Sequence, residues 1–77
     1  MEFTGWSEDE MNSALYIAQD LIMKRIQSDA IKESGWLNKL GEESKQKVIL
    51  TLQGLKPETL KLFIRDLKKK KTKNNPQ

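Results

Sequence analysis

The fold is decided by SEDEMNSALYIAQDLIMKRI, residues 7–26. Its apolar residues recur at spacings of three and four, the period of one face of an α-helix. They are Met11, Ala14, Leu15, Ala18, Leu21, Ile22 and Ile26, and Ile17 widens the same stripe. No stretch of the chain has the alternating pattern of a half-buried strand. The sequence therefore predicts an all-α protein around a helix that is apolar over more than one face.

The start of this helix is marked by Ser7 and Glu10, which have the spacing of a capping box. In that motif the serine hydroxyl accepts from the third N–H of the helix, and the glutamate accepts from the serine N–H. Glu8 and Asp9 fall in the first turn, where the helix dipole favours carboxylates. Because neighbouring helical carboxylates do not converge on one point, we predict no metal site here.

The end of the helix has two interpretations. Continued at helical pitch, the stripe reaches Arg25 and Asp29, so we expect a break between Lys24 and Ser28. Ser28 would then cap a second, short helix over residues 29–34. In the alternative, Arg25 and Asp29 pair at i,i+4 and carry one continuous helix onward.

Three glycines and a proline divide the rest of the chain. Gly35 is expected to be the left-handed residue that ends the short helix, Gly41 and Gly54 bracket another helix, and Pro57 is suited to the first turn of the last. The apolar residues expected to enter the core are Trp36, Leu37, Leu40, Val48, Ile49, Leu52, Leu60, Phe63, Ile64 and Leu67, with Leu50 on the far side of its helix. We therefore predict a compact three- or four-helix bundle with a disordered basic C-terminal tail.

The chain of 77 residues is short enough for one domain with a small core. We predict a lead-in over residues 1–6, one helical domain over residues 7–70 and a disordered lysine-rich tail over residues 71–77, because Lys71 would be the next residue on the apolar face of the last helix. The beginning of the sequence lacks the layout of a secretory signal, and no apolar run is long enough to form a transmembrane segment. We expect a cytoplasmic protein, or a nuclear one in a eukaryotic host.

Charge is unevenly divided along the chain. Residues 1–66 hold nine basic and eleven acidic side chains, a net charge of −2, whereas residues 67–77 hold five lysines and no acid. A duplex-binding domain usually carries its positive charge over a folded face. The predicted helices also open with Glu42, Glu43 and Glu58, which phosphates would repel. Sequence-specific duplex readout by the folded part is therefore not the favoured interpretation.

The side chains that usually carry out catalysis are missing. The sequence has no histidine and no cysteine, so the common general base, nucleophilic thiolate and transition-metal ligands are absent. Its four glycines are scattered and form no phosphate-binding loop. We predict a protein that is not an enzyme, with no catalytic residues, no metal and no cofactor.

One outward-facing feature lies on the first helix. Tyr16 and Met23 are seven residues apart and project from the side away from the main stripe. A central helix wrapped by the others would explain them as packing residues. Aromatic and methionine side chains outside a core are also typical of protein contacts. The favoured hypothesis is a small regulator or adaptor that binds another protein, or a second copy of itself as a homodimer, through this helix surface.

The other outward-facing feature is basic. It consists of Lys61, Arg65, Lys68, Lys69, Lys70, Lys71 and Lys73. Under the alternative hypothesis, the protein is a nucleic-acid-binding accessory protein that grips the backbone phosphates of DNA or RNA with these residues. No aromatic residue follows Phe63, so stacking on single-stranded bases is not predicted. A solvated helix face, an anionic membrane surface or a nuclear import signal would also account for the lysines.

Overall fold

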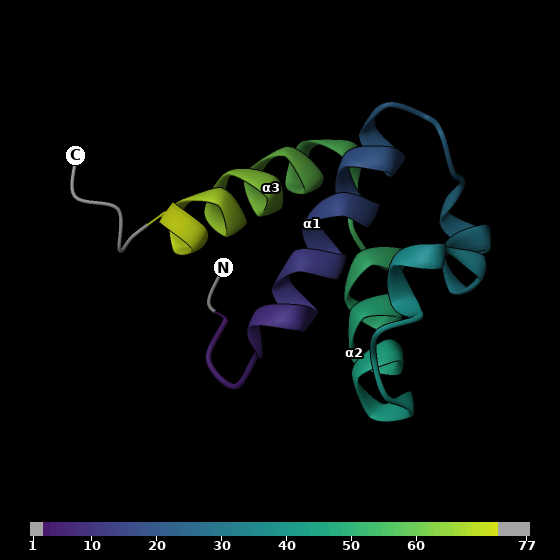
Figure 1. The fold of residues 1–77 in the computed structure, drawn as a ribbon. Coiled ribbons are helices and arrows are strands. Elements are labelled where there is room, and N and C mark those ends of the chain that lie inside the picture. Colours follow the sequence, from purple (N-terminus) through teal and green to yellow (C-terminus); the bar gives the residue numbers. More distant parts are fainter. Residues whose placement is uncertain (1–2, 73–77) are drawn as a thin grey trace.

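Helix α1 (Glu8–Ile22) runs through the middle of the molecule and packs against both α2 (Glu42–Gln53) and α3 (Pro57–Thr72), as Figure 1 shows. The computed structural model describes the backbone of residues 3–72 and the side chains of residues 3–69. The Ser7 hydroxyl accepts from the Glu10 N–H at 3.1 Å, and the Glu10 carboxylate accepts from the Ser7 N–H at 2.8 Å. The predicted capping box is therefore confirmed.

Two short 3-10 helices connect α1 to α2. They are η1 (Ser28–Glu33), which packs against α2, and η2 (Gly35–Leu37), which packs against α1. Over residues 3–72 all regular structure is helical, with no strand. The prediction of a compact all-α bundle is confirmed for this part of the chain.

Helix α1 ends in a Schellman motif. Lys24 adopts the left-handed conformation with φ of 61°, and its N–H donates to the Leu21 carbonyl at 3.1 Å. The Arg25 N–H donates to the Asp20 carbonyl at 2.8 Å, which completes the pair of bonds that defines this motif. The predicted break is confirmed and the single continuous helix is wrong, because the chain turns sharply at Lys24.

Two details of the predicted connection are wrong. Ser28 is the first residue of η1 rather than its cap, and Gln27 precedes it without a capping side-chain bond. Gly35 is not left-handed but begins η2, where the Ser34 hydroxyl accepts from the Trp36 N–H at 3.2 Å. The extended backbone of Ser34, with φ of −68° and ψ of 136°, already makes the corner, so no left-handed residue is needed there.

The core lies between the three α-helices and also takes in the lead-in. Its buried apolar residues are Phe3, Ala14, Leu15, Ile17, Ala18, Ile31, Leu37, Leu40, Val48, Ile49, Leu52, Leu60, Phe63 and Leu67. Phe3 was not predicted to be part of it. Its ring packs edge-on against Trp6 and Phe63, with centroids 5.6 and 5.4 Å away. The segment before α1 therefore contributes a core side chain.

Helix α3 begins at Pro57, as predicted, and buries Leu60, Phe63 and Leu67. It continues through Thr72, past the end expected near Lys71. Residues 73–77, which make up most of the predicted disordered tail, lie outside the described residues. Within residues 3–72, no helix combines the length and apolar character needed to cross a membrane.

Candidate protein-binding surface

Two aromatic rings stack on the surface where η2 crosses α1. The centroids of Tyr16 and Trp36 are 4.4 Å apart and their planes differ by 23°. Tyr16 is 38% exposed and Trp36 is 44% exposed. The prediction that Trp36 enters the core is wrong, because the tight turn of η2 buries the adjacent Leu37 and directs the indole outward. We call Tyr16 and Trp36 the aromatic platform.

Hydrogen bonds to three other residues hold Trp36 in place. Its carbonyl accepts from the Ser13 hydroxyl at 2.7 Å, and its indole N–H donates to the Asp20 carboxylate at 3.2 Å. Its backbone N–H donates to the Ser34 hydroxyl. Residues of α1 and the Ser34 cap of η2 therefore hold the Trp36 backbone, and Asp20 of α1 holds its indole ring.

Two hollows lie beside Trp36, and the ring forms part of the wall of each. The first has a volume of about 230 Å³, and Asp9, Asn12, Tyr16 and Lys39 are among its lining residues. The second has a volume of about 440 Å³ and is lined in part by Asp20, Arg25 and Ile26. The platform thus combines exposed aromatic area with depressions that can receive side chains.

Met23 lies at the C-terminal cap of α1 and is 60% exposed. The structure therefore places both Tyr16 and Met23 at the surface, but it pairs Tyr16 with Trp36 and leaves Met23 off the lining of the two hollows. Sequence reasoning missed Trp36 as a surface residue. Ser34 directly before Gly35 and Trp36 was the available signal, since serine and glycine together favour a turn rather than a continued helix.

The basic feature predicted on the last helix occupies one face of α3. Lys61, Arg65, Lys68 and Lys69 are all exposed, and their spacings of four, seven and eight place them on the same side of the helix. We call these four residues the basic strip. Lys70 and Lys71 continue the backbone of α3, whereas Lys73 lies outside the described residues.

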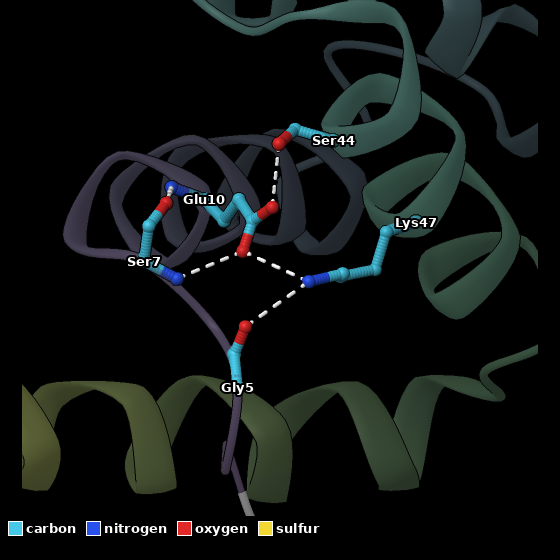
Figure 2. A network of polar contacts seen from close by, with 5 residues as sticks. All are labelled: Gly5, Ser7, Glu10, Ser44 and Lys47. Carbon is cyan, nitrogen blue, oxygen red and sulfur yellow. Dashed lines mark hydrogen bonds and ion pairs between the residues drawn. The ribbon is translucent and has the colours of Figure 1, made fainter.

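A buried carboxylate, Glu10, joins the start of α1 to α2 (Figure 2). The Ser44 hydroxyl donates to it at 2.5 Å, the Ser7 N–H at 2.8 Å and the Lys47 ammonium at 3.1 Å. These hydrogen bonds, with that of Ser44 the largest cause, lower the pKa of Glu10 from 4.5 to about 2. Lys47 also donates to the Gly5 carbonyl at 3.2 Å. The arrangement stabilises the fold, and so low a pKa does not suit proton transfer near neutral pH.

Among the described residues, no group of three or more acidic, histidine or cysteine side chains is arranged to hold a metal ion. Comparisons with protein families, curated proteins and solved structures found no match to this chain. The aromatic platform and the basic strip are the surface features on which a function can be proposed.

Proposed function

We propose that the protein is a small non-enzymatic helical regulator or adaptor that binds another protein through the aromatic platform. The observation that carries the proposal is the Tyr16–Trp36 stack, which is exposed although its rings are held in one arrangement. Tryptophan and tyrosine are the residues that most often dominate the energy of protein interfaces. Met23, at the end of the same helix, adds an adaptable apolar side chain.

The position of the rings also supports this proposal. A tryptophan that served only the fold would be expected to leave less of its surface exposed than the 44% of Trp36, because burial of a large aromatic ring is what stabilises a small domain. Trp36 instead packs on Tyr16, which is itself exposed, while Leu37 next to it enters the core. An exposed, hydrogen-bonded indole between two hollows matches the anchor of a contact surface.

The test compares three full-length proteins as bait in an extract of the source cells. They are the wild type, the double variant Tyr16→Ser with Trp36→Ser, and the control Leu50→Ser, which alters a side chain 67% exposed on α2. We expect the wild type and the control to capture a protein in equal amounts and the platform variant not to capture it. Far-ultraviolet circular dichroism should show that all three baits remain helical. Equal recovery of every captured protein by the three baits would contradict the proposal.

A second copy of the chain is one partner that this surface can accept. A homodimer through the platform predicts a dimeric mass for the wild type and for Leu50→Ser in light scattering after gel filtration. The platform variant would then have the mass of a monomer. A monomeric wild type at all concentrations would exclude the homodimer and leave a different protein as the partner.

We also propose, as a second candidate, binding of nucleic-acid backbones by the basic strip. The observation that favours it is the alignment of Lys61, Arg65, Lys68 and Lys69 on one exposed face. If the strip makes four phosphate contacts, raising the salt concentration from about 50 to about 200 mM should weaken binding roughly a hundredfold. This candidate requires no base readout, so duplexes of different sequence should bind alike.

The basic strip is tested by anisotropy titrations of labelled duplex and single-stranded DNA and RNA at these two salt concentrations. Replacing the four strip residues with glutamine should weaken binding markedly. In a control variant, four exposed lysines elsewhere are replaced with glutamine, so that it loses the same four positive charges. They are Lys24, Lys32, Lys39 and Lys56. Equal loss in both variants would indicate attraction by net charge alone, and absence of binding by the wild type would make the strip a solvated helix face.

A further inference from the structure

We propose that the first hollow beside Trp36 receives an arginine side chain of the protein partner. This inference rests on the proposed function of the aromatic platform and names the chemistry that the platform recognises. The hollow of about 230 Å³ is smaller than the roughly 300–1,000 Å³ that is usual for small-molecule and cofactor sites. It therefore suits one side chain of a larger partner better than a free metabolite.

The wall of the hollow favours a planar cation. Tyr16 and Trp36 both line it, and both rings remain partly exposed. The faces of aromatic rings attract cations, with tryptophan the strongest, and arginine takes part more often than lysine. A guanidinium group can also stack on an aromatic face and is less strongly hydrated than an ammonium, so it loses less on entering a half-closed site.

The polar groups of the hollow supply acceptors for such a cation. Asp9 contributes a carboxylate from the first turn of α1. Asn12, one residue from Ser13 on the same helix, lines the hollow, and its side-chain oxygen is buried without a hydrogen-bond partner. The terminal torsion of asparagine is broad, so the amide can turn this oxygen toward a donor. Guanidinium has five N–H donors and can bond to Asp9 and Asn12 together.

Lys39 is a positively charged residue in the wall of the hollow, and it gives the proposal a second, independent test. Its side chain is exposed and lines the same hollow. Its positive charge repels an arginine, so the site is expected to bind an isolated guanidinium only weakly. Removal of the Asp9 charge and removal of the Lys39 charge must therefore change the affinity in opposite directions.

The experiment titrates the full-length ¹⁵N-labelled protein with N-acetyl-arginine amide and follows the Trp36 indole N–H and the Asn12 side-chain amide by NMR. N-acetyl-citrulline amide is the control probe, because it has nearly the same shape without the charge. We expect saturable shifts at both groups with the arginine probe, and an affinity for citrulline about fivefold lower, the size of a modest cation–π interaction. Shifts that do not saturate, or equal affinity for the two probes, would overturn the proposal.

Two single variants complete the test. We expect Asp9→Asn to weaken and Lys39→Gln to tighten binding of the arginine probe, each by a fewfold. Affinities that do not move, or that move in the same direction, would overturn the arginine site. If the platform-dependent partner is captured but the arginine probe does not bind, the arginine inference fails while the proposed function stands. If the probe binds but no platform-dependent partner exists, the hollow still binds guanidinium, but the proposed function is rejected, and with it the claim that a protein partner supplies the arginine.

Discussion

At the scale of single residues, Lys24 has a conformation that is unusual for its type. It adopts a φ of 61° to end α1, a position where glycine is normally found. The Cβ of any residue other than glycine is crowded by its own backbone in this region, and lysine lacks the short polar side chain with which asparagine and aspartate offset that cost. The Schellman hydrogen bonds from Lys24 and Arg25 hold the chain there nevertheless.

We predict that Lys24→Gly increases the free energy of unfolding by up to about 1 kcal/mol, because glycine removes the steric cost of the left-handed conformation. Urea denaturation at neutral pH measures the change. Lys56→Gly is the matched control, since Lys56 is exposed but has a negative φ. A loss of stability in Lys24→Gly equal to that in the control would show that Lys24 carries no strain.

Glu10 is a buried residue whose charge contributes to the stability of the fold. Replacing it with glutamine keeps a capping side chain but removes the charge that Ser44 and Lys47 bond to, so we expect Glu10→Gln to lose about 2 kcal/mol at pH 7. Since the pKa is lowered from 4.5 to about 2, the advantage of the wild type is complete above 4.5 and is lost as the pH falls toward 2.

Urea denaturation of wild type and Glu10→Gln at several pH values between 7 and about 2 measures this dependence. The exposed Glu8, changed to glutamine, is the control from the same helical turn. A stability difference between wild type and Glu10→Gln that stays constant over this pH range would contradict the assignment of a low pKa to Glu10.

At the scale of elements, the α-helices could be predicted because their signals are local. Ser7 with Glu10 marks one start, Pro57 marks another, and the apolar spacing gives the buried face of each helix. The region over residues 23–40 gave weaker signals, since 3-10 turns are too short to display a period. The contribution of Phe3 could not be predicted either, because its contact with Phe63 joins segments 60 residues apart and follows no periodic pattern.

We predict that Phe3→Ala lowers the free energy of unfolding by about 3 kcal/mol, because it removes a buried ring that packs on Trp6 and Phe63. Thermal and urea denaturation measure the loss. The control Leu50→Ala truncates an exposed side chain on α2 and should stay within about 0.5 kcal/mol of wild type. Equal stability of Phe3→Ala and the control would mean that the lead-in does not belong to the core.

At the scale of the whole molecule, the two candidate surfaces lie on different elements. The aromatic platform is built by α1 and η2, whereas the basic strip lies on α3 alone. The strip could be predicted because it follows from spacing on one helix. Only Tyr16 of the platform could be predicted, since its pairing with Trp36 depends on how η2 crosses α1, and that is a tertiary contact.

The central claim, that the platform contacts a protein partner, is tested most directly by site-specific photo-crosslinking in the source cells. A photoreactive residue is placed at Lys39 beside the first hollow, at Leu50 on α2 and at Arg65 in the basic strip. We predict a crosslinked protein from position 39 and little or none from position 50. Crosslinks from position 65 to nucleic acid with none from position 39, or equal protein crosslinks from positions 39 and 50, would contradict the claim.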